Sequence, residues 1–422
     1  MLRTAALVCA AAAPALAAQS LESRVNAAPD GRVMFSFAAR PGVCGDGRSY
    51  IQMGPNSYSG VFSGDGSRMD PCVAGPVRVV IDRADKLPLS VREFVGPVDS
   101  TLRGVTDLGR VRAQDAVDYL LGLAEKADGR AGRDAIFPAM LADSANTANA
   151  LVAIARNTAL PRETRRAAIS SMARATFGMQ TIPSSVTDEI LSIVRDESDS
   201  RPVRQSALSV LGNLDHGAGI PPLIQLSQQT QSTWLAQQAM STLARSGDPR
   251  ARQYLRTAVR RTDLPDDVLI VALRSLGQEY ATAQDAALLR EIYPTLKNDR
   301  ARDAVFSALA EMGGSENTKW LMDLARNDET PIVTRRRAVE AASRSGASIT
   351  DLVKLYDTTT DPNMKDALVS LYVRSGEKPA IDKLVAIIKG EENATVRRRA
   401  IAQLGRSDDP RVRQALEDIV AK

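Results

Sequence analysis

The feature of this sequence that most restricts its fold is an internal repeat. An alanine followed by an apolar residue recurs at intervals of 29 to 39 residues through most of the chain. The alanines are Ala135, Ala168, Ala207, Ala239, Ala272, Ala304, Ala338, Ala367 and Ala400, and we call them the marker alanines. A period in this range is typical of stacked supersecondary units, because one such unit cannot bury its own apolar face.

Each repeat has the pattern of a helix pair. A leucine stands four residues after several markers, as Leu211 does after Ala207, so both lie on one face of a helix. Glycines such as Gly277 and Gly376 follow, and we expect them to end that helix as left-handed C-caps. A second apolar-striped segment separates successive markers. The chain is 44% hydrophobic but only 4% aromatic, so small aliphatic side chains that suit closely stacked helices form its core.

Two repeats resemble a known family. VRQSALSVLG at residues 203–212 and VRRRAIAQLG at 396–405 are similar to the V-R-x-x-A-x-x-x-L-G core of HEAT repeats, particularly the short type first described in phycobilisome lyases. The resemblance implies a mainly α fold, a right-handed α-solenoid of stacked helix pairs over residues 113–422. The units at Ala239, Ala304 and Ala338 depart from the pattern. Because HEAT repeats occur in scaffolds of unrelated roles, the resemblance implies no activity, and nothing supports bilin attachment.

Residues 1–18 have the three regions of a secretory signal peptide. A basic start precedes an apolar run from Ala5 to Ala13, and small residues up to Ala18 form a cleavage site. The run is shorter than the roughly 20 apolar residues that span a bilayer, so we expect no membrane-spanning segment. The sequence therefore predicts a periplasmic or extracellular protein, similar to exported bacterial proteins that contain HEAT repeats. A cytosolic protein with an alanine-rich first helix is the alternative.

Residues 19–98 predict a small β-rich module. Apolar and polar residues alternate along Val33–Phe37 and Val77–Ile81, the period of half-buried strands. A linker at 99–112 is expected to join the module to the helices. The expected strands are 32–37, 50–53, 58–62, 77–83 and 89–95, with Gly-Asp-Gly turns at 45–47 and 64–66. Calcium binding by the two turn aspartates is the alternative, but neither loop continues into the pattern of a calcium loop.

Two cysteines remain after removal of the signal, and a disulfide between Cys44 and Cys72 is the expected state in an oxidising compartment. The bond would close residues 45–71, a segment rich in Gly, Ser and Asp that has few core-forming side chains. Zinc is the rival interpretation. It has little support because the sequence has no second cysteine pair and its one histidine, His216, is distant.

The motifs of common enzymes are absent from the sequence. There is no Gly-x-Ser-x-Gly elbow, phosphate-binding loop or dinucleotide fingerprint, and a lone histidine in a loop is more often a turn residue than a base. We therefore predict no catalytic, cofactor-binding or metal-binding residue, and leave open a carboxylate pair assembled by folding. The net charge of +4 is small for this length and does not favour nucleic acid as a partner.

Cations recur two residues before the markers. On a helix this offset is about 200°, so we expect these side chains to lie opposite the buried alanine and to form a cationic ladder with a spacing of about 10 Å. Such a ladder would bind a protein or peptide of acidic character. The alternative is an ordinary solvated face neutralised by Asp134, Asp303 and Asp366. The ladder residues are Arg133, Arg166, Arg302, Arg336, Lys365 and Arg398.

These patterns together predict an exported, non-enzymatic scaffold that binds a protein or peptide on its helical repeats. Two alternatives stay open. One is an enzyme or enzyme accessory with a site in the β module or at its junction with the helices, and the other is a binder of an anionic polymer of the cell envelope.

Overall fold

The computed structural model describes residues 19–48, 50–54, 57–59, 72–97, 104–127, 129–175, 183–229, 232–390, 393–404 and 409–420. The predicted signal peptide, residues 1–18, lies outside these ranges. The chain divides into two compact units, residues 1–219 and 220–422, which we call unit 1 and unit 2. Within the described ranges, no helix has the length and apolar character needed to cross a membrane.

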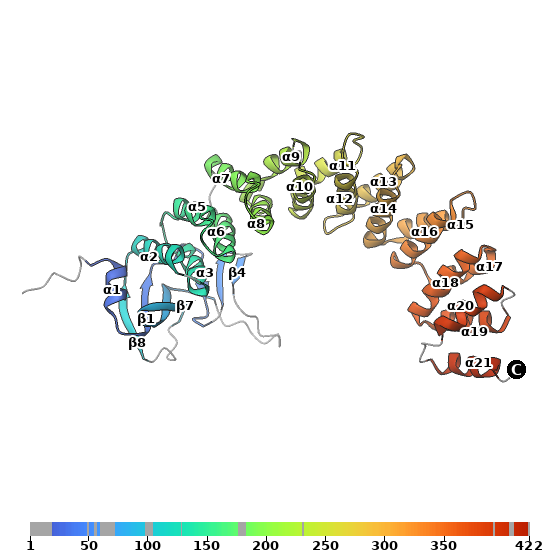
Figure 1. The fold of residues 1–422 in the computed structure, drawn as a ribbon, viewed down its shortest axis with the longest axis horizontal. Helices are drawn as coiled ribbons and strands as arrows, with labels where there is room; N and C mark the ends of the chain where they lie inside the picture. Colours follow the sequence, from blue (N-terminus) through green and yellow to red (C-terminus); the bar gives the residue numbers. More distant parts are fainter. Residues whose placement is uncertain are drawn as a thin grey trace, which may run out of the picture. The chain divides into compact units, whose positions relative to one another are not determined.

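Unit 1 starts with helix α1 (Leu21–Ala27) and continues into two four-stranded sheets (Figure 1). One sheet has the order β7-β6-β1-β8 and the other the order β4-β3-β2-β5. The strands are β1 (Gly31–Phe37), β2 (Cys44–Gly45), β3 (Ile51–Gly54), β4 (Ser57–Ser59), β5 (Val73–Ala74), β6 (Val77–Ala84), β7 (Leu87–Val95) and β8 (Val105–Arg110). The predicted strands at 32–37, 50–53, 77–83 and 89–95 are therefore confirmed. The end of the predicted strand 58–62 and the predicted turn at 64–66 lie outside the described residues.

The predicted linker at 99–112 is wrong where it meets β8. Residues 105–110 pair in parallel with β1 and complete the first sheet. No buried side chain lies along β8, so this strand lacks the apolar alternation by which a sequence shows a strand. Its backbone hydrogen bonds to β1 hold it in place, and Arg24 of α1 donates a further hydrogen bond to the Leu108 carbonyl.

One face of the first sheet forms the core of the β part. Val33, Phe35 and Phe37 on β1 are fully buried. The register places Phe35 opposite Val79 of β6, so large and β-branched side chains alternate across the pair. The ring of Phe35 meets that of Tyr119 edge-on, with centroids 5.9 Å apart. Tyr119 belongs to α2, so this face of the sheet packs against the first long helix.

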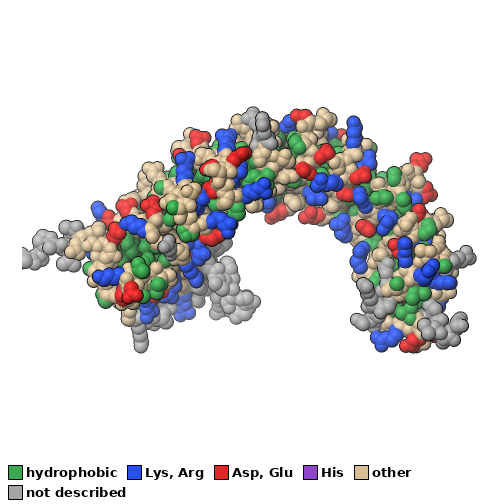
Figure 2. All heavy atoms as spheres, viewed as in Figure 1, with side chains coloured by type: hydrophobic (Ala, Val, Ile, Leu, Met, Phe, Trp, Pro, Cys, Tyr) green, Lys and Arg blue, Asp and Glu red, His purple; other side chains and the backbone are tan. Residues whose placement is uncertain are grey.

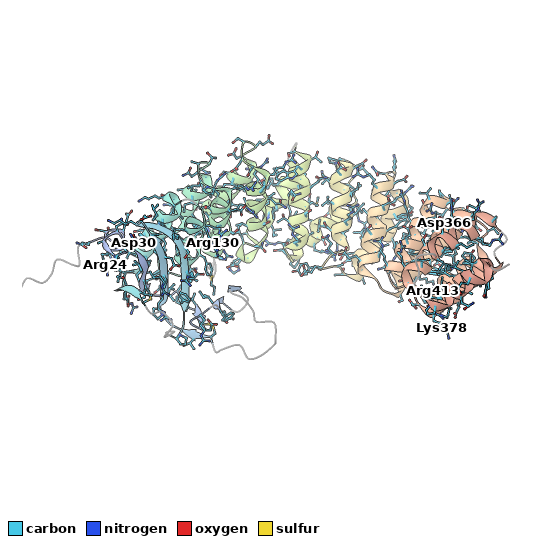
Figure 3. The ribbon with its side chains drawn as sticks, turned by 60° about the horizontal axis from the view of Figure 1, so that its bottom comes forward. Arg24, Asp30, Arg130, Asp366, Lys378 and Arg413 are labelled. Atoms are coloured by element: carbon cyan, nitrogen blue, oxygen red, sulfur yellow. A yellow bond between two sulfur atoms is a disulfide. The ribbon has the colours of Figure 1, made fainter. Side chains whose placement is uncertain are left out.

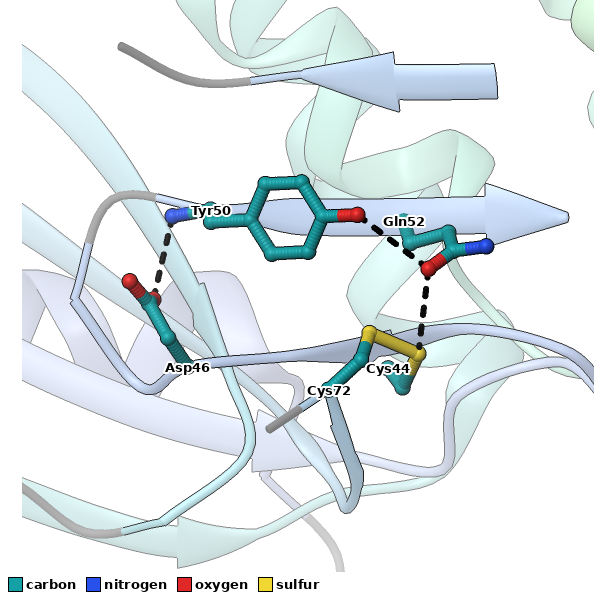
Figure 4. Close-up of a disulfide and its surroundings, with 5 residues drawn as sticks. All are labelled: Cys44, Asp46, Tyr50, Gln52 and Cys72. Atoms are coloured by element: carbon teal, nitrogen blue, oxygen red, sulfur yellow. Dashed lines mark hydrogen bonds between the residues drawn. A yellow bond between two sulfur atoms is a disulfide. The ribbon is translucent and has the colours of Figure 1, made fainter. Parts of the chain in front are cut away.

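The predicted disulfide between Cys44 and Cys72 is present (Figure 4). Cys44 lies in β2, and Cys72 comes directly before β5, the strand that pairs with β2. Gln52 lies 4.0 Å from the sulfur of Cys44 and accepts a hydrogen bond from the Tyr50 hydroxyl. Asp46 accepts hydrogen bonds from the backbone N–H groups of Arg48 and Tyr50, which confirms the predicted turn at 45–47.

Removing this disulfide is expected to destabilise the β part of unit 1. The bond joins residues 28 positions apart, and a crosslink over a loop of this length contributes about 3 kcal/mol by restricting the unfolded chain. A Cys44→Ser/Cys72→Ser variant should lower the denaturation midpoint of unit 1, followed by far-ultraviolet circular dichroism. A thiol assay on the denatured, unreduced protein lacking residues 1–18 should find no free thiol. Two free thiols per chain would contradict the bond.

The rest of the chain is helical, and helix α2 begins at Ala113 as the change of period predicts. In unit 1 the helices are α2 (Ala113–Lys126), α3 (Arg130–Asp134), α4 (Ile136–Met140), α5 (Ala148–Arg156), α6 (Arg162–Ala175), α7 (Ser184–Arg195) and α8 (Arg201–Gly212). In unit 2 they are α9 (Ile220–Gln229), α10 (Thr233–Arg245), α11 (Pro249–Ala258), α12 (Asp266–Leu276), α13 (Ala283–Ile292), α14 (Asp299–Met312), α15 (Ser315–Arg326), α16 (Ile332–Arg344), α17 (Ile349–Thr358), α18 (Pro362–Ser375), α19 (Lys378–Gly390), α20 (Ala394–Leu404) and α21 (Pro410–Val420). Short 3₁₀ turns occur at Asp215–Gly217 and Tyr293–Thr295.

From α5 onward consecutive helices pack in pairs, beginning with α5 and α6, and we call the two members of each pair its A and B helix. In unit 2, successive B helices from α10 to α20 pack against one another, with the A helices along the other side of the row (Figure 1). Every marker alanine is at most 4% exposed. All except Ala135, which lies between α3 and α4, are in B helices. The predicted stack of helix pairs and its register are confirmed.

The glycines that follow the markers have two different roles. Gly376 ends α18 in the left-handed conformation, as predicted. Gly277, by contrast, has φ −88°, so it is not a left-handed cap. A Cβ at Gly277 would lie 2.5 Å from the Cα of Ala308 on α14. Glycine is therefore needed there because α12 and α14 approach closely, and the prediction of a left-handed cap was wrong at this position.

Candidate functional site

The arginine of the V-R motif is a structural residue. Arg165, Arg204 and Arg335, each three residues before a marker, are buried in B helices. The Nε group of each donates to a carbonyl in the last turn of the preceding A helix, where helix carbonyls lack partners of their own. These bonds are Arg165 to Ala155 (2.8 Å), Arg204 to Val194 (2.9 Å) and Arg335 to Ala325 (2.9 Å). In these three repeats the motif arginine thus fastens the two helices of a pair, whereas Arg397, the corresponding residue of α20, is exposed.

The predicted ladder residues are less exposed than expected. Arg398 is exposed, whereas the other five are half-buried. Three of them form ion pairs within their own helix or with a neighbouring residue. These pairs are Arg133 with Asp134 (2.9 Å), Arg166 with Glu163 (3.2 Å) and Arg302 with Asp299 (3.5 Å). Arg166 also donates to Ser206 on the next B helix. The expected exposure applies to a single helix, whereas in the stack the adjacent helices cover part of this position.

The remaining ladder residues lie on α16, α18 and α20. The Lys365 ammonium is 5.0 Å from the ring centre of the buried Tyr356, a cation–π contact. Among the described residues, neither Arg336 nor Arg398 forms an ion pair, and the buried Nε of Arg336 has no hydrogen-bond partner. The structure does not bring the six cations into one equivalent row. It leaves Arg336 and Arg398 as the members whose charge no described carboxylate offsets.

The acidic residues next to the ladder pair mostly across helices. Asp303 of α14 binds Arg337 of α16 at 2.8 Å, and Asp366 of α18 binds Arg399 of α20 at 3.2 Å. We call these two ion pairs the rungs. Only Asp134 neutralises the cation beside it, as the solvated-face interpretation expects. Figure 3 labels Asp366 within the helices of unit 2, and Figure 2 shows cationic and acidic side chains interspersed on the face it presents.

Sequence reasoning missed a buried polar cluster between α11 and α13. Asp285 is fully buried and accepts hydrogen bonds from Arg252 (2.9 Å), Arg256 (2.7 Å) and the Thr282 hydroxyl (2.7 Å). Burial alone would raise the pKa of Asp285, but the hydrogen bonds from Arg256, Thr282 and Arg252 outweigh it and lower this pKa to about 2. Arg252 also binds the carbonyls of Ser275 and Leu276 at the end of α12. Thr282 and Asp285 form a capping box, which is the one part of this cluster that a local sequence pattern indicates.

A second unforeseen carboxyl lies in unit 1. Glu93 is on β7, half-buried beneath α3. Burial raises the pKa of Glu93 to about 7, with a smaller contribution from the negative charge of Asp134 and against the opposing effect of a hydrogen bond from its own backbone N–H. In the described part of the chain, no group of three or more His, Cys, Asp or Glu side chains has the arrangement of a metal site. His216 lies in the short turn at Asp215–Gly217 with φ 56°.

Open grooves between neighbouring repeats occur on the described surface of unit 2. One, of about 460 Å³, lies between the C-terminal ends of α16 and α18 and is lined by Arg344, Leu371 and Arg374 among others. The second, of about 610 Å³, separates α15 from α17 and is lined by Thr318, Lys319 and Ser348 among others. Both combine apolar and polar surface, as peptide-binding grooves do.

Residues 187–277, from α7 to the end of α12, match the family model for HEAT repeats. This segment carries HEAT repeats. No curated protein matches its sequence. Similar solved structures include human deoxyhypusine hydroxylase in complex with glycerol (16% identity, TM-score 0.27), which covers 56% of this chain and 95% of that one.

Two further solved structures are similar to the HEAT-repeat chain. The complex of CpcE and CpcF of phycocyanin lyase from Nostoc sp. has 17% identity and a TM-score of 0.27, covering 56% of this chain and 92% of that one. Lipovitellin has 9% identity and a TM-score of 0.47, covering 80% of this chain and 41% of that one. At these identities and TM-scores, none of the three carries information about function.

Proposed function

We propose that this HEAT-repeat chain is an exported, non-enzymatic scaffold that binds an acidic segment of a protein or peptide along the B helices α16, α18 and α20. Its helix pairs would follow the right-handed path of the HEAT-like solenoid, and nucleic acid is not among the proposed partners. Stacked repeats suit this role because they present an extended surface without needing catalytic groups.

The observation that carries the proposal is the unbalanced charge of Arg336 and Arg398. Asp303 and Asp366, which were expected to neutralise the ladder, bind Arg337 and Arg399 in the rungs instead. A partner carboxylate would supply the counter-charge that both guanidinium groups lack. Export is supported by the Cys44–Cys72 disulfide and by the signal-like residues 1–18.

Removing the two unbalanced charges is expected to weaken binding of an oligoglutamate peptide about tenfold, because each exposed ion pair contributes up to about 1 kcal/mol. The variant is Arg336→Gln/Arg398→Gln, and fluorescence anisotropy at low salt measures the dissociation constant. Binding to the unaltered protein should also weaken as salt rises, since exposed charges are screened over about 8 Å at physiological ionic strength.

The matched control is Arg344→Gln/Arg374→Gln, which removes the same charge from the C-terminal ends of α16 and α18. This control should bind the peptide as the unaltered protein does. If both double variants lose affinity equally, the peptide senses only net charge, and if only the control loses affinity, the groove beside Arg344 is the site. Equal affinity for polyphosphate and oligoglutamate would favour the alternative of an anionic envelope polymer.

A further inference from the structure

Glu93 occupies a position in unit 1 where an apolar side chain is expected. It lies on the core face of β7 between Val91 and Val95, which are at most 3% exposed. Its cross-strand neighbour on β6 is Val79, which is fully buried. Helix α3 packs on this strand. A carboxyl group in such surroundings is costly to ionise unless a cation or several N–H groups reach it.

The charged groups around Glu93 do not neutralise it. On α3, Arg130 and Arg133 both bind Asp134, at 3.0 and 2.9 Å, and Asp134 adds negative charge near Glu93. On β6, Arg83 shares the core face but donates to carbonyls of α1, whereas Arg78 and Asp82 lie on the opposite face. Strand β2 has no acidic or basic side chain, and its Cys44 carries no charge because it is in the disulfide. No described residue forms an ion pair with Glu93.

We propose that protonation of Glu93 closes the contact between α3 and β7 and that its ionisation opens this contact. A neutral carboxyl tolerates the position between Val91 and Val95, whereas a carboxylate must recover water or a cation, and movement of α3 admits either. Because α3 also contacts α2, α4 and α6, opening would loosen the junction between the sheet and the first helices. Arg133 on α3, whose charge Asp134 now offsets, would become available to Glu93 or to a partner.

The pH range follows from the protonation states. The closed form holds the proton up to a pKa of about 7, whereas in the open form Glu93 has an ordinary pKa of about 4.3. The closed contact is therefore fully favoured below about pH 4.3 and is lost as pH rises toward 7. Between these values the opening equilibrium should increase by about tenfold for each pH unit and then level off.

Hydrogen exchange of the full protein, measured by mass spectrometry and corrected for intrinsic exchange, tests this inference. Protection of residues 130–134 and of β7 should fall between pH 5 and 7 in the unaltered protein. The Glu93→Gln variant should stay protected throughout, since glutamine is neutral at every pH. Glu125→Gln, which removes an exposed carboxylate of α2 in the same unit, should behave as the unaltered protein.

Asp134→Asn supplies a second test if Glu93→Gln does not fold. Removing the neighbouring negative charge should lower the pKa of Glu93 in the closed form, so the loss of protection should level off at a lower pH and be smaller than in the unaltered protein. Protection of α3 that does not change with pH, or a Glu93 carboxyl that titrates near 4.3 by carbon-13 resonance in the folded protein, would overturn the inference.

Discussion

Replacing Asp285 with asparagine is expected to destabilise unit 2 by about 3 to 5 kcal/mol, because it leaves Arg252 and Arg256 near each other without their shared counter-charge. Arg252 is itself nearly buried, and its guanidinium also holds the end of α12. Denaturant titration followed by tryptophan fluorescence reports this unit specifically, because the two tryptophans of the chain, Trp234 and Trp320, both lie within it.

The matched control for Asp285 is Asp263→Asn. Asp263 pairs with Arg261 at 2.7 Å, but its side chain is 69% exposed. Exposed pairs contribute at most about 1 kcal/mol, so this variant should unfold close to the unaltered protein. Equal midpoints for the two variants would show that the buried cluster does not stabilise the stack.

The Asp285 cluster also predicts how unit 2 responds to acid. The folded pKa of Asp285 is about 2, lower than the value of about 3.9 for an unfolded aspartate. Its contribution is therefore fully present above about pH 4 and is lost as pH falls toward 2. Asp285→Asn should remove this part of the acid dependence, so the difference in midpoint between variant and unaltered protein should shrink over that range.

Replacing Ala272 with glutamate is expected to cost about 4 kcal/mol or more. Ala272 is fully buried on α12, which packs between α10 and α14, so the site has neither room for the side chain nor a partner for its charge. Arg274→Glu, two residues along the same helix on the exposed side, is the matched control and should change stability little. If both variants unfold at the same denaturant concentration, the assigned repeat register is wrong.

The parts of the fold that could be predicted from the sequence are those that repeated local patterns specify. The marker alanines were predicted correctly because each is buried, and all except Ala135 lie in B helices that pack on one another. Strand β8 and Gly277 depart from expectation because parallel pairing and close helix contact depend on residues far apart in the chain. The same reason explains why Asp285 and Glu93 were not foreseen. The environment of Asp285 is formed by α11 and α13, and that of Glu93 is formed by β7 and α3. In neither case does a local sequence motif include residues from both elements.

The ladder shows the limit of treating one helix at a time. The offset from the marker gives the position of these cations on their own helix, but it contains no information about the next helix. In the stack, Arg166 reaches Ser206 and Lys365 lies against Tyr356. At these two residues the position therefore lies at a seam between repeats, whereas Arg398 is exposed.

The uneven joints between repeats have a mechanical consequence for unit 2. Hydrogen bonds from Arg252 and Arg256 to Asp285 join α13 to α11, and Arg252 also binds the last carbonyl of α12, so this joint should resist bending. Between α15 and α17, by contrast, there is a groove of about 610 Å³. When force is applied to its ends, unit 2 should therefore extend first between α15 and α17, while the joint between α11 and α13 keeps its geometry.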